Sequence, residues 1–232
     1  MDISPAPTAP RPDQIEHWIF DLDNTLYPAS CSLFPQIDLR MRAFISEALK
    51  LPLDEAFRLQ KQYYHHYGTT LRGLMLKHEI EPAAFLAYVH DIDHSVLAPN
   101  PALAAAVAAL PGRKIIFTNG SEHHAENVLA RLGLSDQFDA IFDIAAADYI
   151  PKPNAESYTL LAKRHGIRTD RAAMFEDIAR NLLPAAQSGM ATVWVREDGH
   201  SHWTDDKDED ISHVHHITDD LTGWLERILT KP

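Results

Sequence analysis

The chain has 232 residues, a formal net charge of −12 and one cysteine, Cys31. This length suits one large domain, or a main domain with a smaller insert, and it can bury a core without disulfide bonds. The acidic balance argues against a nucleic-acid backbone or an anionic membrane surface as the partner, so an anionic ligand would need a local positive site. Because a single cysteine excludes an intrachain disulfide, the composition is compatible with a reducing cytoplasm.

Residues 1–11 are rich in proline and alanine and lack the apolar segment of a secretory signal. We expect them to form a loose tail. No stretch approaches the roughly 18 apolar residues that a membrane span requires. The sequence therefore predicts a soluble, cytoplasmic protein with no membrane partner, and it leaves monomer and homodimer open.

A short apolar run from Trp18 to Phe20 ends at two carboxylates, Asp21 and Asp23. This is typical of a buried strand that delivers polar groups at its carboxyl end. In a regular strand the two carboxylates share a face, and they repel each other unless a cation or a proton intervenes. The pattern favours a divalent-cation site. Its alternative is an ordinary turn, in which Asp and Asn side chains bond to the backbone.

Helical patterns fill the next part of the chain, with Gly68 and Pro82 as punctuation. They cover 33–49 and about 54–66, 70–78 and 82–91. We find no convincing strand pattern between Pro28 and Ala98. We therefore expect an all-helical cap domain over 29–98. The core domain would then combine 1–28 and 99–232.

Strand and helix patterns alternate from Pro99 onward. The predicted strands are 113–117, 140–144, 172–175 and 192–195. The predicted helices are 101–110, 121–132, 154–165, 181–187 and 218–229. Alternation of this kind implies a parallel sheet that is covered by helices on both faces. The acidic run 205–210 is best interpreted as a solvated loop.

Polar residues follow four of the predicted strands. Besides the two aspartates after the first strand, they are Thr118, Asn119, Gly120, Lys152, Glu176 and Asp177. In a parallel sheet the carboxyl ends of all strands lie along one edge, so these residues can converge. Taken singly, Lys152 fits an exposed loop cation, and the Thr-Asn-Gly sequence fits a turn before a helix. Together they favour one site.

The four motifs resemble those of the haloacid dehalogenase-like hydrolase superfamily. They are Asp21-Leu-Asp23-Asn-Thr25, Thr118-Asn119-Gly120, Lys152-Pro153, and Glu176-Asp177 with Asn181. The match spans roughly Trp18 to Val195, and the helical segment stands where that family carries its smaller cap domain. The resemblance implies an α/β fold in which a small all-helical cap follows the first strand of a Rossmann-like parallel sheet.

The resemblance also assigns chemical roles. Asp21 would be the nucleophile that attacks phosphorus and forms an aspartyl phosphate. Asp23 would protonate the leaving alkoxide and then activate water. Lys152 would offset negative charge between nucleophile and phosphate. The donors to the phosphoryl oxygens would be Thr118, Asn119, Gly120 and the backbone N–H groups near Leu22 and Asn24.

Mg²⁺ is the implied cofactor. Carboxylate oxygens of Asp21 and Asp177, the backbone carbonyl of Asp23, phosphate and water form an oxygen-rich ligand set that suits a hard cation. Glu176 departs from the commoner Asp-Asp form of the fourth motif. We therefore expect it to be an indirect or secondary metal ligand.

The implied substrate is a small phosphorylated metabolite. Asp23 favours phosphoryl transfer, because haloalkanoate dehalogenases lack the second aspartate. Residues 21–28 and 63–74 resemble the pyrimidine 5′-nucleotidase branch, which implies a nucleoside monophosphate such as UMP or CMP. Candidate substrate contacts in the cap are Tyr67, Thr70 and Arg72, with helix packing as their alternative role. A phosphatase of another small phosphate, a sugar phosphomutase and a non-catalytic binding protein stay open as alternatives.

Fourteen histidines include the pairs 65–66, 123–124 and 215–216. These pairs lack the accompanying Cys or Glu-x-x-His pattern of transition-metal sites. We expect them to be solvated or interface histidines.

Overall fold

The computed structural model describes residues 9–197 and 210–230. Its six-stranded sheet has the order β3-β2-β1-β4-β5-β6, and every neighbouring pair is parallel. The strands are β1 His17–Phe20, β2 Arg113–Phe117, β3 Ala140–Phe142, β4 Ala172–Glu176, β5 Ala191–Val195 and β6 His216–Thr218. The predicted parallel α/β sheet is confirmed. The strand order reverses between β1 and β4, which is where such sheets place their ligand sites.

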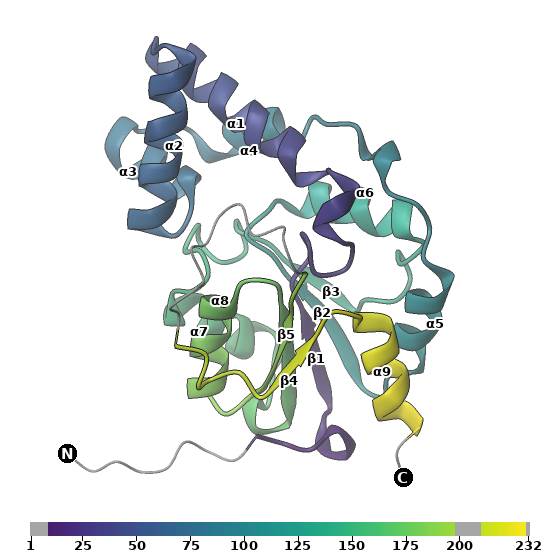
Figure 1. The fold of residues 1–232 in the computed structure, drawn as a ribbon. Coiled ribbons are helices and arrows are strands. Elements are labelled where there is room, and N and C mark those ends of the chain that lie inside the picture. The colour runs from purple at the N-terminus through teal and green to yellow at the C-terminus, as the bar shows by residue number, and fades with distance from the viewer. Residues whose placement is uncertain (1–8, 198–209, 231–232) are drawn as a thin grey trace, which may run out of the picture.

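Helices cover both faces of the sheet (Figure 1). One face packs against α5 (Pro101–Ala109), α6 (Glu122–Leu132) and α9 (Leu221–Thr230), and the other against α7 (Ala155–His165) and α8 (Ala179–Gln187). Trp18 and Phe20 of β1 belong to the first core cluster, whereas Ile19 belongs to the second. Since both faces of β1 are buried, its sequence is apolar without alternation.

Four helices lie between β1 and α5 in the chain. They are α1 (Phe34–Leu49), α2 (Leu53–Tyr67), α3 (Thr70–His78) and α4 (Pro82–Val89). We call them the insert; Figure 1 shows them beyond the carboxyl ends of the strands. Their apolar faces share a cluster that includes Ile45, Leu74 and Phe85. The four helical patterns are confirmed, although α4 ends before the expected Asp91. The division into two domains at 28–29 and 98–99 stays a prediction.

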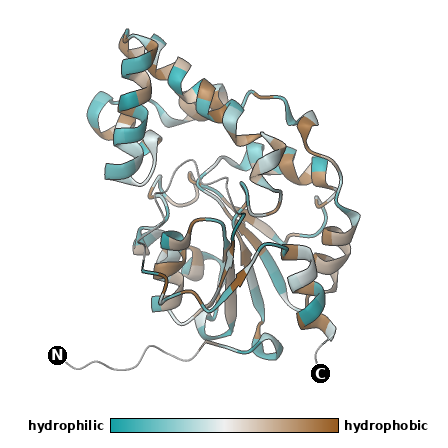
Figure 2. Ribbon diagram, in the orientation of Figure 1, coloured by the Kyte–Doolittle hydropathy of each residue, from teal (hydrophilic) through white to brown (hydrophobic). Residues whose placement is uncertain are grey.

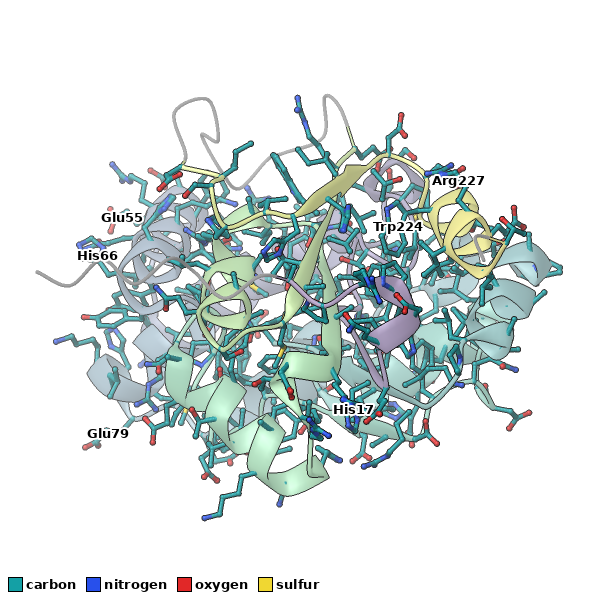
Figure 3. The ribbon with its side chains drawn as sticks, turned by 90° about the horizontal axis from the view of Figure 1, so that it is seen from below. His17, Glu55, His66, Glu79, Trp224 and Arg227 are labelled. Atoms are coloured by element: carbon teal, nitrogen blue, oxygen red, sulfur yellow. The ribbon has the colours of Figure 1, made fainter. Side chains whose placement is uncertain are left out.

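The insert and α9 lie on opposite sides of the molecule. In Figure 3, Trp224 and Arg227 mark α9 on one side, whereas Glu55, His66 and Glu79 mark the insert on the other. The hydrophobic residues are concentrated on the strands and on the inward sides of the helices (Figure 2). Among the described helices, none combines the length and apolar character needed to cross a membrane.

The end of the chain differs from the sequence prediction. Thr218 belongs to the short strand β6, which the sequence analysis missed, and α9 begins only at Leu221. The Asp220 carboxylate accepts the N–H of Gly223 (2.9 Å) and so satisfies a first-turn amide, which makes the helix start after Asp220. The predicted strand 140–144 ends at Phe142. The predicted loop at 205–210 and the tail at 1–11 lie outside the described residues, apart from Asp210 and residues 9–11.

Candidate active site

The candidate site is assembled at the carboxyl ends of the central strands. Asp21 directly follows β1, and its N–H donates to the carbonyl oxygen of Phe175 in β4 (2.9 Å). Thr118 follows β2 in the same way and donates to the carbonyl oxygen of Phe142 (3.1 Å). Glu176 is the last residue of β4. The structure therefore brings these strand ends together at one edge.

Lys152, in the loop between β3 and α7, joins two of the carboxylates. Its Nζ donates to Asp21 Oδ1 (2.6 Å), to Glu176 Oε2 (2.7 Å) and to the carbonyl oxygen of Phe117 (2.9 Å). These acceptors match the three protons of an ammonium group that is almost completely buried. Burial alone would lower the pKa of Lys152, but the charges of Asp21 and Glu176 outweigh it and raise that pKa. Lys152 is thus a fixed positive charge beside Asp21.

Asp21 is held at both carboxylate oxygens. Oδ1 accepts from Lys152, and Oδ2 accepts from the hydroxyl of Thr25 (3.1 Å). Burial and the charge of Glu176 raise the pKa of Asp21 to about 7, while Lys152 opposes the shift. The carboxylate is therefore oriented, and its negative charge is costly at this position without further positive charge.

An acidic cluster that could hold a metal ion surrounds Asp21. Carboxylate oxygens of Asp21, Glu176 and Asp177 all lie within 4.8 Å of one another. Burial and the charges of Glu176 and Asp21 raise the pKa of Asp177 well above its ordinary value. Such crowded oxygens favour a hard divalent cation, because the cation would relieve their mutual repulsion. The donor set therefore fits Mg²⁺.

Both carboxylate oxygens of Glu176 accept hydrogen bonds from the protein. Oε2 accepts from Lys152, and Oε1 accepts from the side chain of Asn181 (3.1 Å) and from the N–H of Ile178 (3.4 Å). An oxygen with two protein donors has little capacity left for a metal ion. Oε2 has Lys152 as its one donor, so the role of Glu176 as an indirect or secondary metal ligand stays a prediction.

Asp23 has a separate set of partners. Its Oδ1 accepts hydrogen bonds from the hydroxyl of Tyr27 and from Nε2 of His124, the latter at 2.8 Å. Burial raises the pKa of Asp23, but the charge and hydrogen bond of His124 and the hydrogen bond of Tyr27 outweigh it and bring the pKa to about 2. The two aspartates are thus held in different electrostatic environments.

The Thr-Asn-Gly motif lies beside the lysine loop. Asn119 Oδ1 accepts the N–H of Lys152 (2.9 Å), and Asn119 Nδ2 lies 3.4 Å from the Lys152 carbonyl oxygen. Thr118 is buried, and its hydroxyl oxygen accepts the N–H of Gly120 (2.9 Å). Asn119 therefore fixes the lysine loop in this structure. The predicted phosphate contacts of these three residues stay predictions.

The loop after β1 presents backbone donors. The N–H groups of Leu22 and Asn24 form no hydrogen bond with any group in the described part of the chain. Asn24 has a φ of 61°, a left-handed conformation that Asn tolerates better than most residues. This turn follows Asp21 at once, so free amides lie close to the candidate nucleophile. Their contact with the phosphoryl oxygens stays a prediction.

The three candidate contacts in the insert have different surroundings. Tyr67 and Arg72 line a cavity of about 380 Å³, together with Pro151 and Pro153 on either side of the lysine. Thr70 is buried, and its hydroxyl donates to the carbonyl oxygen of Gln60 (3.1 Å) inside the insert. The structure thus places Tyr67 and Arg72 at a cavity and Thr70 in helix packing.

The insert approaches the lysine loop closely. Gly68 has a φ of 84°, and a Cβ atom there would lie 3.3 Å from the Lys152 carbonyl oxygen. Tyr64 lies nearby on α2, and the guanidinium carbon of Arg180 on α8 lies 4.7 Å from the centre of its ring. The insert therefore contacts the core on the side of the candidate site.

The sequence analysis missed His124. The expectation of a solvated or interface histidine is wrong at this position, because His124 is completely buried and contacts Asp23. The pairs 65–66 and 215–216 and the neighbouring His123 are exposed, as expected. Position 124 lies in the first turn of the helix that follows the Thr-Asn-Gly motif. This position, one turn into the helix after the motif, was the signal in the sequence that could have indicated a histidine at the site.

The chain is similar in sequence to known proteins. A model of the haloacid dehalogenase-like hydrolase family matches residues 15–189. The chain is 28% identical over 247 residues to phosphate metabolism protein 8 of Saccharomyces cerevisiae, covering 97% of this chain and 69% of that protein. It is 27% identical over 209 residues to a glyceraldehyde 3-phosphate phosphatase of Methanopyrus kandleri, covering 83% of this chain and 89% of that protein.

Solved structures show the same fold. A haloacid dehalogenase-like phosphatase from Thermococcus onnurineus matches with a TM-score of 0.60 and 18% identity, over 93% of this chain and 98% of its own. CbbY from Rhodobacter sphaeroides, in complex with phosphate, matches with a TM-score of 0.60 and 16% identity, over 89% of this chain and 94% of its own. Because the family model matches most of the sequence, the chain belongs to the haloacid dehalogenase-like hydrolase family.

Proposed function

We propose that the protein is a Mg²⁺-dependent phosphatase that hydrolyses a small phosphate monoester through an aspartyl phosphate. The observation that carries this proposal is the pair of carboxylates at the end of β1. Asp21 pairs with Lys152, and Asp23 lies two residues later with its own partners. A halide leaves without a proton, whereas an alkoxide needs one, so Asp23 favours phosphate ester hydrolysis.

The residues divide the reaction into two displacements. In the first, an Asp21 oxygen forms a bond to phosphorus and the bond from phosphorus to the alcohol oxygen breaks. Asp23 is ionised in the free site, so it would take up a proton when the negative charge of the bound phosphate raises its pKa, and it would then donate that proton to the departing oxygen. In the second, Asp23 takes a proton from water, the water oxygen bonds to phosphorus, and the bond to Asp21 breaks. Lys152 keeps Asp21 oriented and offsets the charge that gathers during both displacements.

Mg²⁺ would be held by Asp21, Asp177 and the carbonyl oxygen of Asp23, with Glu176 as an indirect or secondary ligand. When bound, it would supply positive charge for the phosphoryl oxygens. The crowded carboxylate oxygens support this assignment. Calorimetric titration with Mg²⁺ tests it: we expect binding to the wild-type protein and a large loss in Asp177→Asn. Unchanged binding in that variant would contradict the assignment.

A nucleoside 5′-monophosphate such as UMP or CMP is the proposed substrate. The resemblance of residues 21–28 and 63–74 to the pyrimidine 5′-nucleotidase branch supports it. The insert would act as a mobile cap that selects the substrate and excludes water, with hinges near 27–28 and 98–99. The cavity between the insert and the lysine loop gives Tyr67 and Arg72 a place to contact the substrate.

A sugar or triose phosphate is the second candidate. The observation that favours it is the similarity to glyceraldehyde 3-phosphate phosphatases and to the fructose-1-phosphate phosphatase YqaB of Escherichia coli, which is 37% identical over 87 residues. For the location of the protein we propose a reducing compartment such as the cytoplasm, with which the free thiol of Cys31 is compatible.

Phosphate release from a panel of nucleotides and sugar phosphates separates the two candidates. We expect the highest kcat/KM for UMP or CMP. Arg72→Ala should lower the ratio of kcat/KM for UMP over AMP, while hydrolysis of 4-nitrophenyl phosphate changes much less. Arg58→Ala, on an exposed turn of α2, is the matched control. A preference for sugar phosphates that Arg72→Ala leaves intact would contradict the nucleotide assignment.

A further inference from the structure

A cluster of three histidines lies beside Asp23 and has no role in the chemistry described above. His124 is in the first turn of α6, His90 follows α4, and His94 begins the short helix His94–Val96. The His124 ring stacks on His90, with centroids 4.4 Å apart and planes 11° apart. Its Nδ1 lies 3.3 Å from Nε2 of His94. The cluster thus joins the end of the insert to the core.

His124 has a single orientation in this cluster. It is completely buried, and its backbone N–H donates to the hydroxyl oxygen of Ser121 (3.3 Å). The same hydroxyl lies 2.8 Å from Nδ1 of His90, so it also anchors the ring that stacks on His124. One ring nitrogen thus lies near His94 and the other near Asp23, so the imidazole has a partner at both nitrogens.

The two oxygens of Asp23 have different environments. Oδ1 accepts from both His124 Nε2 and the Tyr27 hydroxyl. Oδ2 has no hydrogen bond within the described ranges. A Cβ atom at Gly120 would lie 3.7 Å from Oδ2, so this oxygen lies next to the Thr-Asn-Gly motif. One oxygen is therefore fixed to the protein, and the other faces the predicted phosphate-binding groups.

We propose that His124 is a positioning residue for Asp23. Its Nε2 fixes Oδ1, so that Oδ2 meets first the departing alcohol oxygen and then the attacking water. The terminal torsion of an aspartate is broad, so the carboxylate needs partners to keep one orientation. The inference rests on the proposed function, because it takes Asp23 as the acid and base.

The leaving group distinguishes positioning from a structural role. An alkyl phosphate needs its leaving oxygen protonated, whereas 4-nitrophenolate leaves without a proton. The value of kcat/KM reports only the steps up to departure of the alcohol. A misplaced Asp23 should therefore lower kcat/KM for the alkyl phosphate alone. Partial unfolding lowers both values equally, so their ratio is independent of how much protein is folded.

Two amide variants separate the two ring nitrogens. His124→Gln places its terminal nitrogen near the position of Nε2 and can still donate to Asp23. His124→Asn places its nitrogen near Nδ1 and loses the contact with Asp23. His123→Asn is the matched control, because His123 is the adjacent residue and its side chain is 79% exposed.

The substrates are 4-nitrophenyl phosphate and the alkyl phosphate that the wild-type protein hydrolyses best. For His124→Asn we expect a loss of at least about 30-fold in kcat/KM for the alkyl phosphate, because positioned acids contribute roughly 10²- to 10⁴-fold. The loss for 4-nitrophenyl phosphate should stay below about threefold, because that leaving group needs no acid. For His124→Gln we expect kcat/KM for the alkyl phosphate to lie within about fivefold of the wild-type value, because the Gln amide can still donate a hydrogen bond to Asp23.

Two results would overturn the inference: equal losses for both substrates in His124→Asn, or equal kcat/KM values for the alkyl phosphate in the Asn and Gln variants. The proposed function would still stand in either case, provided that the wild-type protein hydrolyses these phosphates. If the wild-type protein hydrolyses neither phosphate, the proposed function falls and the inference falls with it.

Discussion

Lys152 is the residue on which the charge balance of the site depends. Its ammonium group bridges Asp21 and Glu176, and all three side chains are buried. Removing one partner from a buried ion pair is strongly destabilising, because the remaining charges lose their compensation. The same residue therefore supports both the fold and the candidate chemistry.

Lys152→Met should lower the free energy of unfolding by about 3–5 kcal/mol, since it leaves two buried carboxylates facing each other. Chemical denaturation in a buffer with a chelator measures this. Adding Glu176→Gln to the variant removes one of the two charges and should recover part of the loss. If Lys152→Met has the same free energy of unfolding as the wild type under these conditions, Lys152 does not stabilise the fold by compensating the two carboxylates.

His90 links stability to pH. Burial, followed by the charge of His124, lowers the pKa of His90 from 6.5 to about 3. Above pH 6.5 the ring is neutral in both the folded and unfolded states. As the pH falls below 6.5, only the unfolded state gains the proton, so stability is lost progressively down to about pH 3.

From pH 7 to pH 5, His90 should therefore cost the folded protein about 2 kcal/mol of unfolding free energy. His90→Asn keeps an amide near Nδ1 for the contact with Ser121 but does not titrate. Denaturant unfolding at both pH values should show that the variant loses about 2 kcal/mol less than the wild type. Parallel losses in the two proteins would show that His90 is protonated in the folded state.

At the scale of elements, the packing of α2 on α3 depends on one glycine. A Cβ atom at Gly73 would lie 2.4 Å from Cγ of Tyr63, which is near the base of that side chain. The Tyr63 ring has little freedom to move, because its hydroxyl lies 2.7 Å from Nε2 of His78. Gly73 thus lets two helices of the insert approach closely.

Gly73→Ala should destabilise the protein by about 1–3 kcal/mol, the usual cost of overpacking. In a Tyr63→Ala background the clash is gone, and the same substitution should be neutral or stabilising by about 1 kcal/mol through helix propensity. Denaturation of the four proteins of this cycle measures the coupling. Equal effects in both backgrounds would contradict the packing described here.

The elements that could be predicted are those with a strong periodic pattern. The four helices of the insert and the buried strands β1, β2, β4 and β5 follow from apolar spacing. The edge strand β6 could not be predicted, because its three residues carry no period and its pairing with β5 is a long-range contact. The start of α9 depends on the Asp220 side chain, which the apolar pattern does not reveal.

At the scale of the whole molecule, the sequence predicts which strand ends converge but not the contacts between side chains. The topology of a parallel sheet brings Asp21, Lys152 and Glu176 to one edge. The exchange of hydrogen bonds between Asn119 and Lys152, and the burial of His124 against Asp23, depend on the paths of loops and on the insert. Neither leaves a periodic signal in the sequence.

The central claim is that Asp21 becomes phosphorylated, and a trapping experiment tests it most directly. Asp23→Asn should still react with 4-nitrophenyl phosphate, because that leaving group needs no acid, but it lacks the base for the second displacement. Acid quenching followed by mass spectrometry of the digested protein should then find a phosphoryl group on Asp21. The double variant with Asp21→Asn should carry none. A phosphoryl group on another residue, or continued phosphate release by Asp21→Asn alone, would contradict the account.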